Sequence, residues 1–379
     1  MTPMHLKLIF LSSLVALGAL AAVGASERAV DRTSLWEKSG GSVLWGFDNM
    51  YQPAVVHEPG GRYPFKMWFM GWAAATCNPG YPGCDAIFHA RSKDLEHWEV
   101  YAGDGRWDAT MNPRLWVPVV PADDKPYDQW HNGDPSVVRS GGLYYMAFTS
   151  TGFDLDGKRG DDRADTDGWL SCVMGAVSRD GIHWRKTSAP ILIWPEDRGR
   201  REGYSDDRNY YGDYARPSLM RDRGCWRLWF DYWCQGSGVS MGYAENRSDF
   251  MKPDQWKVLR AGKSPVLPMW PNTSVIKAGG RYYSYSDPPN YPAGGGHPWL
   301  SRQIFEAESV DGLNWNVLGY VPPDADTPAC QVPEGLVLKR DGRAWIYVFY
   351  ACQIGGDPYD WRYNRIRCMR RHVLPGGPR

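Results

Sequence analysis

Four copies of one short motif recur along the chain, and this repetition constrains the fold more than any other feature. The copies follow the pattern S-x-D-[G/L]-x-[H/N]-W, and their aspartates are 86, 74 and 57 residues apart: Asp94, Asp180, the degenerate Asp254 and Asp311. Asp-Gly favours a tight turn, because glycine accepts a positive φ without steric cost. We therefore expect Asp94, Asp180 and Asp311 to be turn residues of a repeated supersecondary unit.

A second repeat runs in phase with the first. Short apolar strands that open with a polar residue or proline are each followed by a turn and an aromatic strand. The predicted strand pairs are 52–56 with 65–69, 134–138 with 143–148, 216–220 with 226–230, 272–276 with 281–285, and 333–337 with 344–349. Alternation, β-branched residues and aromatic residues favour strands over helices. A β-sandwich gives no reason for repeats in phase, so the sequence predicts an all-β fold, a five-bladed β-propeller.

The N-terminal segment has the features of a secretory signal peptide. Lys7 lies in a weakly positive region, residues 8–22 are mostly apolar, and small residues precede Ser26. We expect residues 1–25 to be removed and residues 26–379 to form a single propeller domain that is secreted or periplasmic. An uncleaved anchor is the alternative. The formal net charge is zero, which implies neither a nucleic-acid partner nor an anionic membrane surface. After cleavage we expect no membrane insertion and a monomer.

Export would permit disulfide bonds, and the chain has eight cysteines. Cys77 and Cys84 bracket a turn-rich loop, and we expect them to pair. Two further pairs are suggested by position: Cys225 with Cys234 flanks one aromatic strand, and Cys330 with Cys352 spans the last hairpin. The chain has no C-x-x-C pair and its histidines are scattered, so we expect no metal cofactor. A structural Ca²⁺ at the propeller axis is left open.

Candidate functional residues stand where the innermost strand of each blade begins, because these strand entries converge on one end of the axial channel. They are Trp45, Asp48 and Gln52; Trp130, His131 and Asp134; Asp213 and Arg216; Trp270 and Asn272; and Glu334. Aromatic faces stack on sugar C–H surfaces, while acids and amides bind hydroxyls, so this set predicts a carbohydrate partner. Hydrolysis of a glycosidic bond needs two carboxyl groups, one protonated and one ionised. A strand near 43–45 should close the ring beside Cys368.

The blade pattern resembles that of the five-bladed propeller glycoside hydrolases, the furanosidase superfamily of families 43, 32, 62, 68 and 117. The resemblance rests on x-D-P-S-V-V at Asp134, G-x-Y-Y-M-x-F-T-S at 142–150 and S-x-D-G-x-H-W at 178–184, and it covers nearly all of residues 26–379. It implies a glycosidase. In family 43 an aspartate at the start of the first blade is the base, an aspartate at the start of the second tunes pKa and orients the substrate, and the glutamate of a Glu-Gly pair at the start of the third is the acid. No single family is matched, and the family 32 signature W-M-N-D-P-N-G is missing.

The carry-over of individual roles is partial. Asp134 matches the second family 43 position, and Asp48 lies four residues before the first, where Gln52 stands. The third position fails, because blade three opens with Arg216-Pro217 instead of Glu-Gly. Glu334-Gly335 opens blade five, and Glu202-Gly203 lies in the loop before blade three. The resemblance therefore implies Glu334 first, and Glu202 second, as general acid, with Asp48 or Asp134 as base or nucleophile.

Two alternatives to a hydrolase also fit the sequence. Arg216 at the expected acid position is compatible with a non-catalytic, lectin-like propeller that recognises polysaccharide or takes part in its assembly. A propeller lyase or transferase acting on the same kind of polymer is the other. Arginine cannot release its proton, but it can pair with a neighbouring carboxylate. We expect Arg216 and His131 to bind substrate. The sugar is left open between pentofuranose polymers such as arabinan and a bacterial exopolysaccharide.

Overall fold

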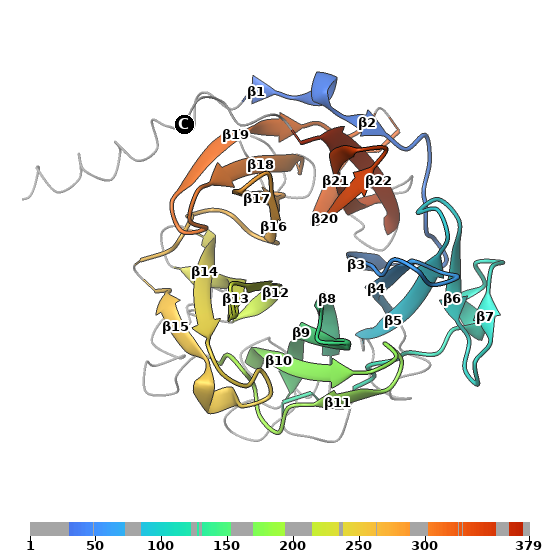
Figure 1. Ribbon diagram of the computed structural model, residues 1–379, viewed down its shortest axis with the longest axis horizontal. Helices are drawn as coiled ribbons and strands as arrows, with labels where there is room; N and C mark the ends of the chain where they lie inside the picture. The colour runs from blue at the N-terminus through green and yellow to red at the C-terminus, as the bar shows by residue number, and fades with distance from the viewer. Residues whose placement is uncertain are drawn as a thin grey trace, which may run out of the picture.

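Five sheets stand around a central axis in the computed structural model, which confirms the predicted all-β, five-bladed propeller (Figure 1). The structure describes residues 30–47, 49–72, 85–122, 127–128, 131–152, 170–193, 214–234, 238–262, 264–288, 302–324, 326–327, 329–353 and 364–373. Several predictions concern residues outside these ranges: the signal peptide 1–25, Asp48, Trp130, Asp213, Glu202, and the Cys77–Cys84 bridge.

Each blade begins with its innermost strand and runs outward. Blade one contains β3 (Met50–His57), β4 (Phe65–Trp72), β5 (Asp85–Ser92), β6 (Trp98–Tyr101) and β7 (Trp107–Asp108). Blade two contains β8 (His131–Ser140), β9 (Leu143–Gly152), β10 (Leu170–Ser178) and β11 (Trp184–Lys186). Blade three contains β12 (Ala215–Asp222), β13 (Cys225–Cys234), β14 (Gly238–Asn246) and β15 (Lys257–Arg260).

Blade four contains β16 (Ser274–Ala278), β17 (Arg281–Ser286), β18 (Ile304–Ser309), β19 (Trp315–Val321) and, outermost, β1 (Val30–Asp31). Blade five contains β20 (Cys330–Arg340), β21 (Arg343–Gln353), β22 (Asn364–His372) and, outermost, β2 (Glu37–Lys38). The helical segments in the described part of the chain are short 3₁₀ turns: η2 (Thr33–Leu35), η3 (Pro113–Leu115) and η6 (Pro253–Gln255). Among these residues no helix has the length and apolar character needed to span a membrane.

The N-terminal segment closes the ring, as predicted, although its regular strands lie earlier than expected. β2 pairs with β22, the strand that holds Cys368, and β1 adds a parallel strand to β19. Leu44, within the predicted segment, forms only an isolated bridge with Ile366. These contacts cover edges that blades four and five would otherwise expose.

The hydrophobic core is divided into clusters that each lie between two neighbouring blades. Blades one and two share a cluster around Trp68 and Phe148, and blades three and four share one around Trp229 and Phe305. Three further clusters fill the other contacts around the ring. Every blade therefore buries apolar side chains on both faces, which explains why the aromatic strands recur in phase with the blades.

A β-bulge at the start of the inner strand repeats around the ring. The pairing register shifts after Tyr51, Gly133, Ala215 and Gln331. The next residue has a positive φ in each case, and Asn272 does likewise in blade four: Gln52, Asp134, Arg216, Asn272 and Val332, with φ between 44° and 52°. Proline follows in four of these blades, where the bulge on an edge strand leaves no ladder hydrogen bond for a donor.

In the fifth blade, the structure corrects the expected correspondence between Glu334 and the strand-opening residues of the other blades. Val332, not Glu334, takes the position that corresponds to Asp134. Glu334 corresponds instead to three serines that join neighbouring blades through their hydroxyl groups. Ser136 Oγ accepts the N–H of Leu219 at 2.9 Å. Ser218 Oγ and Ser274 Oγ accept the N–H of Val275 and of Gly335 at 2.8 and 2.9 Å.

The repeated S-x-D-G-x-[H/N]-W motif forms a self-contained turn, which confirms the structural role expected for its aspartates. Asp180 Oδ1 accepts the N–H groups of Ile182 and His183, both at 2.9 Å, and Oδ2 contacts His183 Nδ1 at 2.7 Å. Asp94 and Asp311 make corresponding contacts. Partial burial opposes the charge of Asp94, but hydrogen bonds from His97 and Glu96 lower its pKa to about 2.

The motif glycine also joins adjacent blades, and this contact gives a stability prediction. Gly181 has a φ of +81°, its carbonyl accepts Trp68 Nε1 at 2.8 Å, and an added Cβ would lie 2.6 Å from Trp68 Cζ2. Gly181→Ala should therefore lower the free energy of unfolding by about 2–4 kcal/mol, measured by chemical denaturation. Gly142→Ala is the control, since Gly142 has a φ of +80° with open space around it. Equal losses in both variants would show that the contact with Trp68 contributes nothing.

Two of the expected disulfide pairs are not formed. Cys330 and Cys352 stand directly opposite each other on β20 and β21, as the hairpin position suggested. Both are free thiols, and so is Cys225, which excludes its pairing with Cys234. Burial raises the pKa of the Cys352 thiol to about 12, so that this sulfur is a neutral part of the core between blades four and five.

Candidate functional site

Two acidic side chains from neighbouring blades flank one arginine at the axis. Arg216 Nε lies 3.9 Å from Asp134 Oδ2, and Arg216 Nη1 lies 3.6 Å from Asp231 Oδ2. The side chain of Arg216 is 41 % accessible, whereas those of Asp134 and Asp231 are 8 % and 2 % accessible. Asp134 and Arg216 both occupy bulge positions with positive φ. The bulge thus brings an acid and a guanidinium to the same end of the channel.

The polar network continues from blade three into blade four. Asn272, the bulge residue of blade four, donates its backbone N–H to Asp231 Oδ2 at 2.8 Å and its Nδ2–H to Asp287 Oδ1 at 2.6 Å. Arg302 Nη1 donates to the other oxygen of Asp287 at 3.0 Å. Asp231, Asp287 and Asn272 are all at least 97 % buried. The acids and the arginines therefore alternate along a buried floor.

Amide side chains carry the network through blade five to the start of blade one. Arg302 Nη1 donates to Gln331 Oε1 at 3.2 Å, and Gln331 Nε2 donates to Asn364 Oδ1 at 2.8 Å. Asn364 Nδ2 then donates to Asn49 Oδ1 at 2.9 Å. Asn49 directly precedes β3. Every blade thus contributes polar groups to one region, as expected for an axial site.

An aspartate–histidine pair links blades one and two beside Asp134. Asp85 Oδ2 lies 2.8 Å from His131 Nδ1, with the two side chains 11 % and 15 % accessible. Burial disfavours the imidazolium, but the hydrogen bond and charge of Asp85, together with the charge of Asp134, raise the pKa of His131 above its ordinary value. Gly133 leaves room for Met70 and for the ring, because a Cβ there would lie 2.2 Å from Met70 Sδ and 3.1 Å from His131 Nε2. His131 therefore belongs to the axial site with a fixed orientation.

Two carboxyl groups in the inner region hold protons more tightly than usual. Burial raises the pKa of Asp231 to about 7, although the charge of Arg216 and the hydrogen bond from the N–H of Asn272 act to lower it. Burial also raises the pKa of Glu334 to about 8, against a hydrogen bond with Ser274. Within the described part of the chain, Asp231 Oδ1 and Glu334 Oε2 have no hydrogen-bond partner. Near neutral pH each of them can therefore supply a proton.

The structural role of these positions does not require a carboxyl group. Thr149 on β9 corresponds to Asp231 on β13, and its hydroxyl accepts the N–H of Arg216 at 2.7 Å. A threonine thus makes the same link between blades that Asp231 makes to Asn272. Ser274 likewise fills the position that Glu334 fills in blade five. A hydroxyl group is sufficient to join the blades at these positions. The presence of carboxyl groups at Asp231 and Glu334 therefore favours a chemical role for them.

The other predicted site residues in the described part of the chain differ in how exposed their side chains are. Gln52 is fully buried, and its amide O and N have no hydrogen-bond partner among the described residues. Trp45 is 44 % exposed. Trp270 is a correction: it is 2 % exposed, lies in the cluster between blades three and four, and donates Nε1 to Ser284 Oγ at 2.9 Å. It packs the core and presents no face for sugar stacking.

Asp85, Asp231, Asp287 and Arg302 are site residues that sequence reasoning missed. Asp231 lies on β13 three residues before its end, and Asp287 directly follows β17. Antiparallel pairing returns that end to the start of the inner strand, where Asp231 opposes Ala215. An acid within or directly after an aromatic second strand was the available signal. Among the described residues, no group of three or more His, Cys, Asp or Glu side chains is arranged to hold a metal ion.

Relatives in sequence are distant and cover part of the chain. No protein-family model matches it. Two proteins of Mycobacterium tuberculosis, both described as uncharacterized, from strains CDC 1551 / Oshkosh and H37Rv, are 24 % identical over 164 residues. This match spans 43 % of the chain and 42 % of each relative's length.

Solved structures match almost the whole chain in fold. A glycoside hydrolase is 15 % identical with a TM-score of 0.58, over 96 % of this chain and 97 % of that one. An N-acetylgalactosamine deacetylase from F. plautii is 14 % identical with a TM-score of 0.58, over 90 % and 96 %. A family 117 glycoside hydrolase from Zobellia galactanivorans is 14 % identical with a TM-score of 0.56, over 89 % of both. The chain therefore has the five-bladed propeller fold found in glycoside hydrolases of families 117, 62, 43 and 32.

Proposed function

We propose that the chain binds a polysaccharide or oligosaccharide at the propeller axis and hydrolyses a glycosidic bond there. The observation that carries this proposal is the placement of Arg216 between Asp134 and Asp231, on a buried floor of acids and amides. Such a floor offers hydrogen-bond donors and acceptors for several sugar hydroxyls. The names of most of the similar solved structures add support, since they are glycoside hydrolases.

The proposed mechanism uses one carboxyl group in each protonation state. Glu334, with a pKa of about 8, gives its proton to the leaving oxygen as the glycosidic C–O bond breaks. Asp134, paired with Arg216, removes a proton from the attacking water, or attacks the anomeric carbon to form an ester that water then hydrolyses. Asp48 is the second candidate for this role. A carboxyl separation of about 5–5.5 Å gives retention of configuration, and about 6.5–9.5 Å gives inversion.

The proposed location of this activity is outside the cytoplasm. The apolar segment 8–22 and the small residues before Ser26 support cleavage of a secretory signal peptide. The candidate substrates are then exported or extracellular polymers, either arabinan-type pentofuranose chains or a bacterial exopolysaccharide. N-terminal sequencing of the protein recovered from the periplasm or medium should begin at Ser26. A protein that remains in the cell with Met1 intact would contradict export.

A reducing-sugar screen of the purified protein against a panel of polysaccharides tests the activity. The panel should contain arabinan, arabinoxylan and several exopolysaccharides, and release of reducing ends from at least one is the expected result. Isothermal titration calorimetry with oligosaccharides from the same panel provides the second measurement. Binding without cleavage across the panel would favour the lectin-like alternative, and neither binding nor cleavage would contradict a carbohydrate site.

A further inference from the structure

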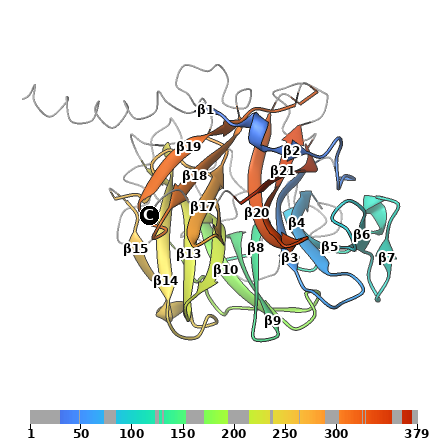
Figure 2. The same ribbon diagram turned by 45° about the horizontal axis from the view of Figure 1, so that its top comes forward.

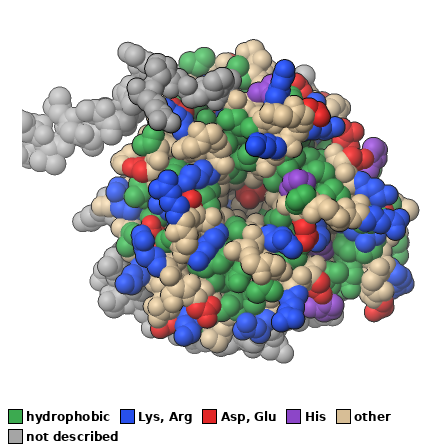
Figure 3. Space-filling model, in the orientation of Figure 1, with side chains coloured by type: hydrophobic (Ala, Val, Ile, Leu, Met, Phe, Trp, Pro, Cys, Tyr) green, Lys and Arg blue, Asp and Glu red, His purple; other side chains and the backbone are tan. Residues whose placement is uncertain are grey.

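Cationic side chains gather near the axis on the face of the propeller opposite the axial site. Inner strands β8, β12 and β16 end there with a cation at the same position, three residues after the serine that joins the next blade: Arg139, Arg221 and Lys277. Each lies five residues, or about 16 Å, along its strand from the bulge residue, at about 3.3 Å per residue. When the top of the molecule is turned toward the viewer, the hairpin between β8 and β9 moves to the bottom (Figure 2). The hairpin therefore lies at the front in Figure 1, which looks onto this face. Lys and Arg side chains surround the central opening there (Figure 3).

Part of this charge belongs to an ion cluster that repeats between blades. Between blades one and two, Glu58 accepts the Tyr144 hydroxyl and pairs with Lys66 and with Arg139 Nη2 at 2.8 Å. Between blades three and four, the corresponding acid is Asp222. The repetition shows that each acid neutralises cations within its own cluster and helps to join the blades.

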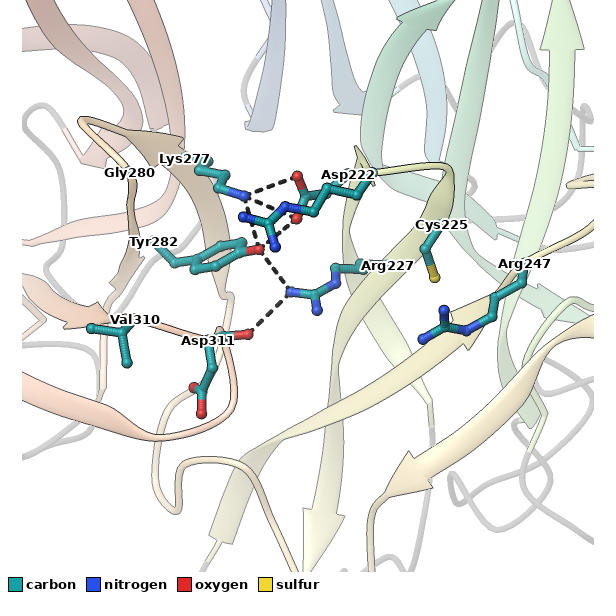
Figure 4. A pocket seen from close by; sticks show the side chains of 10 residues that line it. Asp222, Cys225, Arg227, Arg247, Lys277, Gly280, Tyr282, Val310 and Asp311 are labelled. Carbon is teal, nitrogen blue, oxygen red and sulfur yellow. Dashed lines mark hydrogen bonds and ion pairs between the residues drawn. The ribbon is translucent and has the colours of Figure 1, made fainter.

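The cluster between blades three and four repeats the contacts of the acid with a tyrosine hydroxyl and with a cation of the next blade. Asp222 Oδ2 accepts the Tyr282 hydroxyl at 2.6 Å, and its Oδ1 lies 2.9 Å from Lys277 Nζ. Arg227 Nη1 donates to the Tyr282 hydroxyl at 2.9 Å and to the Asp311 carbonyl at 3.1 Å. Figure 4 shows these side chains converging on one space, with the bonds drawn as dashed lines.

This second cluster lines a pocket, and the lining has a surplus of positive charge. The pocket has a volume of about 310 Å³ and is lined by four cationic side chains, Arg223, Arg227, Arg247 and Lys277, but by only two acids, Asp222 and Asp311. The carboxylate of Asp311 is bound by the N–H groups of Leu313 and Asn314 within its own turn. The two acids of the pocket therefore leave cationic donors that face the solvent.

Arg223 is an additional cation in comparison with blade one, whereas Arg247 takes the position that Lys93 occupies after β5. Arg223 is exposed in the turn between β12 and β13, where blade one has Pro59. Arg247 follows β14, its side chain is 79 % accessible, and one of its nitrogens pairs with Glu245 at 3.0 Å. Neither takes part in joining the blades, so the pocket holds two accessible guanidinium groups beyond what the fold uses. Guanidinium groups pair with carboxylate and sulfate oxygens through two parallel hydrogen bonds.

We propose that this pocket binds an acidic group, carboxylate or sulfate, of a polysaccharide chain that lies across the face opposite the axial site. A polymer fits better than a monomer, because further exposed cations stand at the same end of the inner strands, including Lys339 and Arg340 at the end of β20. A sugar polymer fits better than single-stranded nucleic acid, which needs exposed aromatic rings for base stacking. The one exposed large aromatic side chain among the described residues, Trp45, is 44 % exposed and precedes the start of β3 at the other end of the blades.

Affinity electrophoresis tests this surface without relying on hydrolysis. The full-length protein should be retarded in gels that contain polygalacturonate or dextran sulfate, but not in gels that contain neutral dextran. Retardation should fall as salt is raised, because the contacts are between charges at the surface. Replacing Arg223 and Arg247 by Ala should weaken binding by about tenfold or more, as expected for the loss of two charge-assisted contacts.

A matched control removes the same charge elsewhere. Arg106→Ala with Arg114→Ala takes two exposed arginines from the blade-one region and should leave retardation unchanged. Circular dichroism and the melting temperature should be unchanged in both double variants, since all four side chains are exposed. Equal losses in the two double variants would overturn the proposal, because binding would then follow net charge alone. Equal retardation by duplex DNA, or none by either acidic polysaccharide at low salt, would overturn it as well.

Discussion

Asp134→Asn should lower kcat/KM by about 10²-fold or more, which corresponds to roughly 2.7 kcal/mol of transition-state stabilisation. The substitution retains the shape of the side chain and removes the charge that faces Arg216 at 3.9 Å. Asp134 is held by the bulge on a paired inner strand, so the loss should come from chemistry and not from displacement. Initial rates on the substrate found by the panel screen provide the measurement.

Asp180→Asn is the matched control, because it makes the same chemical change at the turn of blade two. The carboxylate of Asp180 is bound by its own turn, and neighbouring hydrogen bonds hold its pKa well below the usual range, although partial burial opposes this. Turnover should be nearly unchanged in this variant, with an effect on stability only. If Asp134→Asn keeps full activity as well, Asp134 is a structural residue and the assignment of the base is wrong.

Glu334→Gln should have the second large effect, lowering kcat on a polysaccharide by about 10²- to 10⁴-fold through loss of the general acid. In the wild-type protein, activity should decline as pH rises through about 8, the pKa to which burial raises this carboxyl group. An aryl glycoside of the same sugar needs little protonation of its leaving group, so its hydrolysis should be impaired far less. Equal losses on the polymer and on the aryl glycoside would exclude Glu334 as the acid.

Glu334→Gln should lower activity but raise the free energy of unfolding at alkaline pH. The folded-state pKa of Glu334 is about 8, above the ordinary value of 4.5, so the folded protein keeps a proton that the unfolded chain releases. Stability is then greatest below pH 4.5 as far as this group is concerned, and falls as pH rises toward 8. Glutamine cannot ionise, so at pH 8 the variant should be more stable than the wild type by the order of a few kcal/mol. An unchanged pH dependence of denaturation would contradict the buried, protonated state.

The architecture was predictable because two independent patterns recur in phase. The aspartate turns mark where third strands end, and the apolar and aromatic runs match β3–β4, β8–β9, β12–β13, β16–β17 and β20–β21. The fifth blade was misaligned because Glu334-Gly335 resembles a catalytic pair, while Val332-Pro333 is apolar. The proline after the bulge residue in blades one to three, at 53, 135 and 217, was the better guide.

The site was predictable only where its residues begin an inner strand. Asp134, Arg216 and Asn272 belong to the axial network, as their strand-opening positions suggested. Asp231 escaped notice because it stands inside an aromatic run, and pairing across the hairpin, not sequence distance, brings it to Arg216. Asp85 depends on contact between two blades, and no local pattern encodes such contacts. Trp270 was assigned to the site because exposure cannot be deduced from residue type.

A crystal structure of Asp134→Asn with an oligosaccharide from the cleaved polymer would test the central claim most directly, since the slowed variant should retain its substrate. We expect the sugar at the propeller axis, with hydroxyl or ring oxygens within about 3.2 Å of Arg216 and of the amide at position 134. The glycosidic oxygen should lie within the same distance of Glu334. An oligosaccharide bound only away from the axis, under conditions in which the wild type cleaves it, would contradict the account.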